Sequence, residues 1–210
     1  EGAVYDSNRY TVFGLLTRMG CEVIDMGVVR DEPALLEAAF AKAALEADAI
    51  ITSGGVSVGE ADFTKAMMKK LGDVAFWKIA MRPGRPMAVG RIGKSVLFGL
   101  PGNPVAVMVT FLAFVRPALL RMMGSTASAP VFLRAKSLEA LRKKSGRTEY
   151  QRGFVSTAAD GSLQVRAAGN QGSGVLRSMV EGNGLIVLHH TQGNVALGDE
   201  VDVMMFEGVI

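Results

Sequence analysis

Residues 47–62 read ADAIITSGGVSVGEAD, in which a short apolar segment runs directly into a glycine-rich loop. The apolar part, residues 47–51, predicts a buried strand, and the residues after Asp62 predict a helix from Phe63 to Leu71. A strand that passes through a loop into a helix is the repeating unit of sheets with parallel strands. This stretch therefore favours an α/β fold whose sheet is covered by helices on both faces.

The same alternation of helices and strands extends on both sides of this stretch. Asp31-Glu32-Pro33 predicts a helix start, because an acidic residue followed by a proline in the first turn is common there. Further helices are expected at 7–19, 33–44 and 103–123, and further strands at 22–26, 74–81, 87–89 and 95–98. The first part of the chain is thus predicted to be an open, mostly parallel sheet flanked by helices.

A change of pattern predicts a second domain. Residues 125–130 (STASAP) form a small-residue linker that ends in proline. Beyond it, short segments alternate apolar and polar residues and are separated by glycine-containing turns such as Glu181-Gly182-Asn183-Gly184. Such segments predict a small antiparallel β-barrel or sandwich. We expect two domains, residues 1–125 and 126–210.

The composition indicates a globular protein of a reducing compartment. The chain of 210 residues is 49% apolar and 20% charged, which excludes intrinsic disorder. Its most apolar stretch, residues 104–115, is shorter than the roughly 18 residues of a membrane span, so we expect a buried helix and no membrane partner. Cys21 is the only cysteine. It cannot form an internal disulfide or a cysteine-based metal site, and it favours a cytoplasmic location.

Positive charge is concentrated in one part of the chain. The net charge of +3 is too small to indicate a nucleic-acid partner, but residues 74–138 contain no Asp or Glu. Their cationic residues are Lys78, Arg82, Arg85, Arg91, Lys94, Arg116, Arg121, Arg134 and Lys136. Either these side chains form a solvated basic face, or some of them line a pocket for phosphate or another small oxyanion.

Three loops rich in glycine or proline contain the candidate binding residues. Two of them, at 52–62 and 99–104, are expected at the carboxyl ends of strands, where open α/β sheets bind ligands. The third, at 81–86, presents two guanidinium groups on a stiffened turn. The candidates are Ser53, Gly54, Gly55, Ser57, Arg82, Arg85, Pro101, Gly102, Asn103 and Pro104. Glycine amides before a helix bind phosphate, but the same loops also fit plain strand-to-helix turns and helix caps.

Two acidic residues are candidates for a metal site. Asp31 and Asp62 each end a strand-to-helix connection, so both carboxylates are expected on one rim of the sheet. Mg²⁺ is usually held by carboxylates beside a substrate phosphate. As plain helix caps, the two residues would look the same in the sequence. His189 and His190, the only histidines, are interpreted as ordinary residues at the end of a barrel strand.

Six segments carry a resemblance to a known family. They are Tyr5-Asp6-Ser7-Asn8, Arg30-Asp31, the stretch 53–62, Phe76-Trp77-Lys78, Arg82-Pro83-Gly84-Arg85-Pro86 and Gly99-Leu100-Pro101-Gly102-Asn103-Pro104. In this order and spacing they resemble the MoeA family of molybdopterin molybdenumtransferases, whose animal counterpart is the E domain of gephyrin. The resemblance continues through Gln151-Arg152-Gly153 and Gln171-Gly172-Ser173 and covers essentially the whole chain.

The resemblance implies the last step of molybdenum cofactor assembly. Such enzymes cleave adenylylated molybdopterin with a divalent cation such as Mg²⁺, release AMP and place molybdenum from molybdate on the dithiolene sulfurs. A homodimer with its cleft at a subunit boundary is also implied, and a contact with the molybdopterin adenylyltransferase is compatible with it. By position, Asp31 and Asp62 resemble the functional acids and metal ligands. Pro101 and Pro104 resemble the prolines of the cleft, and Ser57, Lys78 and Arg82 the anion-contacting group.

The chain departs from the family pattern at two points. The family has a further strand, an acid-bearing loop and two more domains before the residue at which this chain starts, so we expect little molybdenum-inserting activity from these 210 residues alone. Ala106 stands where relatives commonly have Ser, which is expected to remove one molybdate contact.

Two other functions stay open as alternatives. The first is a molybdopterin adenylyltransferase-like binding domain, although Val56 and Ala61 differ from that enzyme's usual Thr and Arg. The second is a non-catalytic scaffold such as the gephyrin domain, which would not require Asp31 and Asp62.

Overall fold

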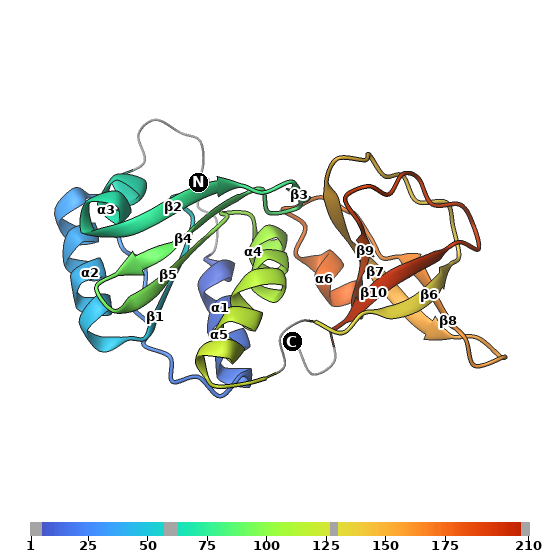
Figure 1. Ribbon diagram of the computed structural model, residues 1–210, viewed down its shortest axis with the longest axis horizontal. Coiled ribbons are helices and arrows are strands. Elements are labelled where there is room, and N and C mark those ends of the chain that lie inside the picture. The colour runs from blue at the N-terminus through green and yellow to red at the C-terminus, as the bar shows by residue number, and fades with distance from the viewer. Residues whose placement is uncertain (1–5, 57–62, 127–129, 207–210) are drawn as a thin grey trace. The chain divides into compact units, whose positions relative to one another are not determined.

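The structure is a computed structural model that describes residues 6–56, 63–126 and 130–206. The chain divides into two compact units, whose elements are labelled in Figure 1. The first unit consists of Glu1–Ile79 and Gly84–Phe111, and the second of Ala80–Pro83 and Leu112–Ile210. The domain boundary expected at residues 125/126 stays a prediction.

The first unit contains the helices and strands of an α/β domain, as the sequence predicted. Its elements are α1 (Ser7–Arg18), α2 (Pro33–Glu46), β1 (Ala49–Ser53), α3 (Phe63–Leu71), β2 (Gly72–Lys78), β4 (Pro86–Ile92), β5 (Ser95–Leu100) and α4 (Pro104–Thr110). Asp6, and not Ser7 or Asn8 as the sequence suggested, is the N-cap of α1, where it accepts a hydrogen bond from the backbone N of Arg9. Prolines occupy the first turns of α2 and α4, where a missing N–H costs nothing.

The sheet of this unit is open and has the strand order β1-β5-β4-β2. β1 and β5 pair in parallel, whereas β5–β4 and β4–β2 are antiparallel. β4 and β5 are antiparallel because only Gly93 and Lys94 connect them, which is too short for a crossover. The α/β class with an open sheet is confirmed, but the pairing among these four strands is mixed and not mostly parallel.

Two expected strands differ from the structure. Residues 22–26 have no strand assignment. A strand exists only where a neighbour satisfies its backbone N–H and C=O groups, and no described strand pairs with this segment. The strand expected at 74–81 is divided, because β2 ends at Lys78 and Met81–Arg82 forms a separate strand, β3, of the second unit.

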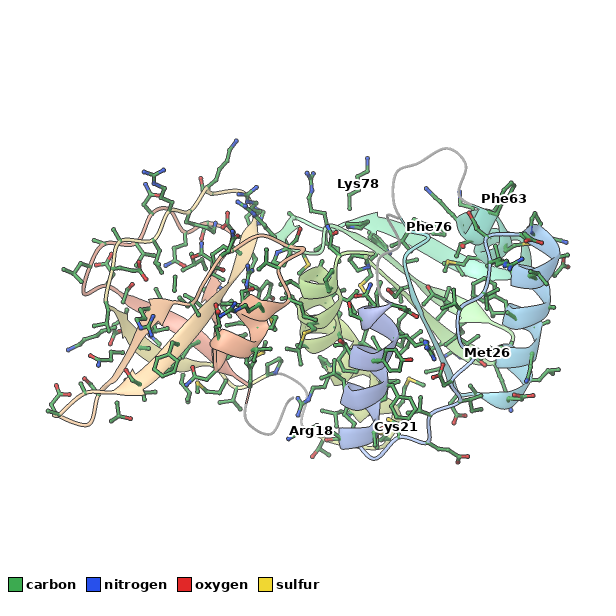
Figure 2. All side chains as sticks on the ribbon, turned by 180° about the vertical axis from the view of Figure 1, so that it is seen from behind. Arg18, Cys21, Met26, Phe63, Phe76 and Lys78 are labelled. Atoms are coloured by element: carbon green, nitrogen blue, oxygen red, sulfur yellow. The ribbon has the colours of Figure 1, made fainter. Side chains whose placement is uncertain are left out.

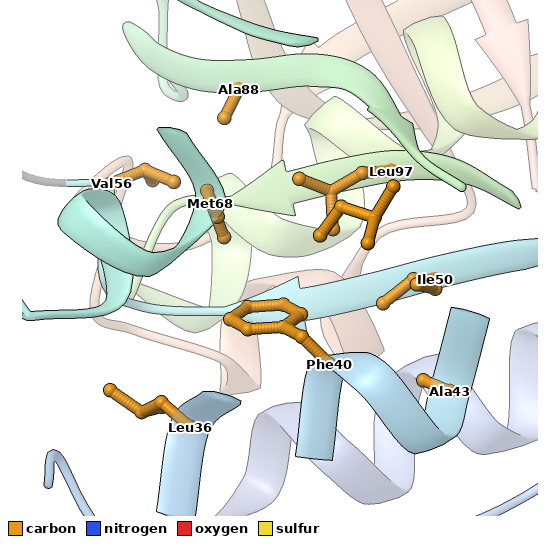
Figure 3. Packing of buried hydrophobic residues seen from close by; sticks show 9 residues of the cluster. Leu36, Phe40, Ala43, Ile50, Val56, Met68, Ala88 and Leu97 are labelled. Atoms are coloured by element: carbon orange, nitrogen blue, oxygen red, sulfur yellow. The ribbon is translucent and has the colours of Figure 1, made fainter. Parts of the chain in front are cut away.

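Helices cover both faces of this sheet. Figure 1 shows α2 and α3 on one face and α1 and α4 on the other. On the first face, Phe40 and Leu36 of α2 and Met68 of α3 pack against Leu97 of β5 and Ile50 of β1 (Figure 3). Burial of one such side chain stabilises a fold by about 1.5–3 kcal/mol, so this cluster holds α2 and α3 against the sheet.

The apolar helix after β5 is interrupted by a wider turn. α4 is followed by the π-helix η1 (Phe111–Val115) and then by α5 (Arg116–Met122). Pro117 explains the interruption, because it has no N–H to donate and its ring clashes with the carbonyl four residues earlier, inside η1. By length and composition, residues 104–122 could cross a membrane, but 56% of the apolar window is buried inside the protein, as in a core helix.

The second unit is a closed barrel, as predicted. Its further elements are β3 (Met81–Arg82), β6 (Leu133–Ser137), β7 (Thr148–Thr157), β8 (Leu163–Ala167), α6 (Arg177–Glu181), β9 (Gly184–Leu188) and β10 (Glu200–Met205). Five strands follow in the order β7-β8-β6-β10-β9, and pairing of β9 with β7 closes the ring. All of these pairings are antiparallel except β6–β8. Val165, Ile186 and Val203 are fully buried inside it.

Candidate functional site

Three strands of the first unit end at the same edge of the sheet. β1 and β5 are parallel, and their last residues, Ser53 and Leu100, are register partners. β4 is antiparallel to both β5 and β2, so β2 runs in the direction of β5 and ends there too, at Lys78. With β4 between them, β2 and β5 lie about 10 Å apart, which is two strand spacings. We call this the strand-end edge, and ligands of α/β folds bind at such edges.

Two of the candidate loops lie side by side at the strand-end edge. The glycine loop begins after β1 with Gly54, whose backbone N donates to Leu100 O at 3.1 Å. The proline loop, residues 101–104, follows Leu100 directly. Asn8 at the start of α1 joins them, since its Nδ2 donates to Ser53 Oγ at 2.8 Å and to Gly102 O at 2.7 Å. The sequence motifs around residues 8, 53 and 102 therefore meet in space.

Asp31 is connected to the same edge through Thr64. Thr64 Oγ1 donates to Asp31 Oδ1 at 3.3 Å, and Thr64 also packs against Gly55 of the glycine loop. The N-cap position of α2 is Glu32 and not Asp31, and no side chain caps that helix. Asp31 is therefore an exposed carboxylate beside the glycine loop rather than a helix cap.

The proline loop forms the start of α4. Pro101 is buried, whereas Gly102 and Asn103 are exposed. Asn103 is the N-cap residue, and its backbone O accepts from Val107 N at 2.9 Å, but its side chain makes no capping hydrogen bond. Pro104 occupies the first turn. The loop thus presents an exposed Gly-Asn pair at a helix N-terminus, where anions are favoured.

The predicted cations are divided between the two units. Lys78 is exposed at the end of β2 and points away from the sheet (Figure 2). Arg85 is exposed in the turn that follows β2, which is closed by a hydrogen bond of 2.8 Å from Ile79 N to Arg85 O. Arg82 belongs to the second unit, where β3 pairs with the start of β7. Lys78 and Arg85 are therefore at the strand-end edge of the first unit, and Arg82 is a residue of the barrel unit.

The barrel unit contains a buried cation beside Arg82. Arg152 is 1% exposed, and its guanidinium donates to Ser178 Oγ, Asn170 O and Gly172 O at 3.0, 2.9 and 3.2 Å. Burial, together with the positive charge of Arg82, lowers the pKa of Arg152 to about 10. Among the described residues no carboxylate pairs with it. A buried cation with no paired carboxylate favours the binding of an anion beside it.

Several predicted residues are not brought together by the described structure. Ser57 and Asp62 lie outside the described residues, so the expected pair of Asp31 and Asp62 stays a prediction. Within the described ranges no cluster of three or more His, Cys, Asp or Glu side chains suits a metal ion. His189 follows β9 and contacts Asp202 at 2.6 Å, and His190 lies in the turn after it.

Sequence reasoning gave Asn8 only a capping role, shared with Ser7, at the start of the first helix, and it gave no role to Thr64 or Arg152. Asn8 and Arg152 lie inside the segments Tyr5-Asp6-Ser7-Asn8 and Gln151-Arg152-Gly153, which carried the family resemblance. Thr64 lies two residues after such a segment. Membership of these motifs was the signal in the sequence that could have pointed to the residues. Their hydrogen bonds and contacts join distant parts of the chain, so they become visible only in the folded structure.

The fold and the strand-end edge agree with a single class of protein. Residues 1–121 match the family described as "probable molybdopterin binding domain", and the chain belongs to it. Residues 134–206 match "MoeA C-terminal region (domain IV)". The resemblance found in the sequence is thereby confirmed.

The chain is similar to several curated proteins and solved structures. The chain is 44% identical over 211 residues to a molybdopterin molybdenumtransferase of Haemophilus influenzae, with 100% of the chain and 52% of the relative covered. It is 35% identical to one of Nostoc sp., covering 97% of the chain and 48% of the relative. A molybdopterin biosynthesis MoeA protein from Pyrococcus horikosii superposes with a TM-score of 0.79 at 29% identity over 98% of this chain and 49% of that one. The chain spans about half the length of these relatives.

Proposed function

We propose that the chain is the substrate-binding half of a molybdopterin molybdenumtransferase. In molybdenum cofactor biosynthesis, such an enzyme inserts molybdate into adenylylated molybdopterin and releases AMP. The observation that carries this proposal is the meeting of the glycine loop, the proline loop and Asp31 at one strand-end edge. The relatives that match the chain over its whole length carry this activity in their names.

The proposed substrate roles in the first unit follow from the chemistry of the edge. Amides of the glycine loop and the first turn of α4 bind phosphate oxygens, and Lys78 and Arg85 supply full positive charges. A helix terminus alone contributes only about 0.3–1 kcal/mol, whereas a hydrogen bond to a charged group contributes about 1.5–3 kcal/mol. The cations therefore account for most of the proposed affinity. In the proposed binding site, Ser53, Gly102 and Asn103 lie at its border, Pro101 and Pro104 stiffen the proline loop, and Ser57 adds a hydroxyl.

Asp31 is the proposed ligand of Mg²⁺, together with Asp62. The exposed carboxylate of Asp31 fits this role, because it is an oxygen donor beside a proposed phosphate site and does not cap a helix. When bound, Mg²⁺ neutralises negative charge on the phosphate that is cleaved. Asp31 then holds the cation, and Thr64 orients the carboxylate through its hydroxyl.

In the barrel unit, Arg152 and Arg82 are the proposed anion-binding residues. Two like charges, one of them buried, are stabilised by an oxyanion, and molybdate is the oxyanion of this reaction. We expect molybdate to raise the unfolding temperature of the protein, and Arg152→Gln to remove that increase.

The proposal also covers the oligomeric state, the location and the protein partner of the enzyme. It includes a homodimer, a cytoplasmic location and a contact with the molybdopterin adenylyltransferase, each of which rests on the family resemblance. The match of residues 134–206 to the MoeA C-terminal region favours the transferase over an adenylyltransferase-like domain. A scaffold role gains no support from the structure.

A reconstitution in the complete protein tests the proposed activity. With adenylylated molybdopterin, molybdate and Mg²⁺, Asp31→Asn is expected to reduce AMP release about 100-fold, because one metal ligand loses its charge. Asp73→Asn is the control, since Asp73 is an exposed acid at the opposite end of β2. Chelation of Mg²⁺ should stop AMP release and spare molybdopterin binding. Equal rates for the wild type and Asp31→Asn would contradict the proposed role of Asp31.

A further inference from the structure

The side-chain amide of Asn8 hydrogen-bonds to both loops of the strand-end edge. It lies in the first turn of α1, 45 residues before Ser53 and 94 before Gly102. Both hydrogens of its Nδ2 are used, one for each loop. The backbone contact from Gly54 N to Leu100 O also joins the ends of β1 and β5.

The orientation of this amide follows from its partners. Gly102 O is a carbonyl and can only accept, so the nitrogen of the Asn8 amide must face it. The amide oxygen, Oδ1, is then buried and has no hydrogen-bond partner within the described part of the protein. A buried acceptor without a partner is unfavourable, and such groups in native proteins call for an explanation. The contacts of Nδ2 with the two loops provide one.

The start of α1 is itself held in place from two sides. Asp6 accepts from the backbone N of Arg9, and the Arg9 guanidinium pairs with Asp6 and with Asp25 at 3.0 and 2.8 Å. Asp25 in turn accepts from Gly27 N at 2.9 Å. Asn8 therefore projects from a helix start that neighbouring residues fix.

From these contacts we propose that Asn8 is a positioning residue, which holds the glycine loop and the proline loop in their ligand-binding arrangement. The proposal rests on the proposed function, because it assigns the support of that same site. Asn8 acts through Ser53 and Gly102 and does not itself touch the substrate. Without it, the two loops lose the side-chain hydrogen bonds that join them and move more independently. A protein whose competent state is less populated binds its ligand more weakly in proportion.

Variants of α1 separate the hydrogen bonds from the shape of the side chain. Asn8→Asp has the same shape but places a carboxylate against Gly102 O, and Asn8→Ala removes both contacts. Thr17→Ala is the matched control, because Thr17 Oγ1 donates to Phe13 O within the same helix and touches neither loop. Melting curves verify that each variant is folded.

Amide hydrogen exchange and molybdopterin titration are measured on the same variants of the 210-residue chain. We expect Asn8→Asp and Asn8→Ala to increase exchange at Gly54 and Gly102 and to weaken molybdopterin binding about tenfold, with Thr17→Ala like the wild type. Unchanged exchange in Asn8→Ala, or wild-type behaviour of Asn8→Asp in both measurements, overturns the inference. If the wild-type chain binds no molybdopterin, the proposed function fails, and exchange alone decides whether Asn8 positions the loops.

Discussion

At the scale of single residues, the strand-end edge depends on a glycine that a larger residue cannot replace. Gly55 has φ +69°, and a Cβ built there would lie 2.5 Å from Thr64 Cγ2. Contact at that distance forces either the loop or the start of α3 to shift. The absence of a side chain at residue 55 is therefore what lets Thr64 reach Asp31 and the glycine loop at the same time.

Gly55→Ala is expected to destabilise the protein by about 2–4 kcal/mol, from the left-handed backbone and the clash together. Gly54→Ala is the matched control, because Gly54 has φ +86° but nothing within 4 Å of its Cβ position. It should cost only about 1–2 kcal/mol. Urea denaturation of both variants measures the difference, and equal losses would show that the contact with Thr64 does not matter.

Single residues of the site also differ in how far the sequence predicts them. The segment 53–55 was expected to form a loop at the end of a strand, because glycines after an apolar run indicate it. Its connection to Asn8 was not expected, since nothing in the local sequence reveals a partner 45 residues away. Arg152 was missed for the same reason. Its burial depends on Asn170, Gly172 and Ser178, which come close only in the folded barrel.

At the scale of elements, the barrel is reinforced by an ion-pair group across β6 and β10. Arg134 of β6 pairs with Asp202 and Glu200 of β10, at 3.0 and 3.2 Å, and His189 contacts Asp202 at 2.6 Å. Burial alone would raise the pKa of Asp202, but the hydrogen bonds from His189 and Arg134 outweigh it, so the pKa lies below its usual value of 3.8. The ionised form of Asp202 is therefore stabilised in the folded barrel.

Because its pKa is lowered on folding, Asp202 stabilises the fold at pH values above about 4, and this contribution is lost as the pH falls below that value. Asp202→Asn should lower stability by about 1–2 kcal/mol at pH 7. The difference from the wild type should become smaller as the pH falls below about 3.8. Thermal unfolding of both proteins at pH 7, 5 and 3 measures this difference.

Glu200→Gln is the control. Glu200 is a more exposed partner of Arg134, so this variant should change stability by less than about 0.5 kcal/mol. A constant difference at all three pH values would contradict this account.

Some elements followed from local pattern and others did not. The helix at Phe63–Leu71 and the strands around residues 50 and 97 were predicted from apolar periodicity, which reports burial directly. The strand over 74–81 was predicted as one piece, whereas its last part pairs with β7. Apolar alternation shows that a segment is extended and half-buried, but it does not identify the neighbouring strand. Partner choice is a property of the whole chain.

At the scale of the whole molecule, the second unit includes a short segment that lies within the sequence of the first. Residues 80–83 interrupt the first unit and belong to the second, which also includes residues 112–125. A fragment of residues 126–210 lacks both pieces. Thr148 N, which donates to Ala80 O at 2.9 Å in the intact chain, loses this partner in the fragment.

We therefore expect the fragment 126–210 to be less stable than the barrel in the full chain, by about 1–3 kcal/mol, with faster amide exchange at Thr148. A fragment of residues 112–210 restores the helical part and serves as the comparison. Equal exchange protection of β7 in the fragment 126–210 and in the full chain would instead support a boundary at 125/126.

The interleaved connectivity has a consequence for the growing polypeptide. Thr148, the register partner of Met81, follows it by 67 residues. At a synthesis rate of about 5–20 residues per second, that interval lasts roughly 3–13 s. During that interval Met81, which is 2% exposed in the folded protein, has no strand partner in the barrel. Until Thr148 has been translated, Met81 therefore cannot pair with β7.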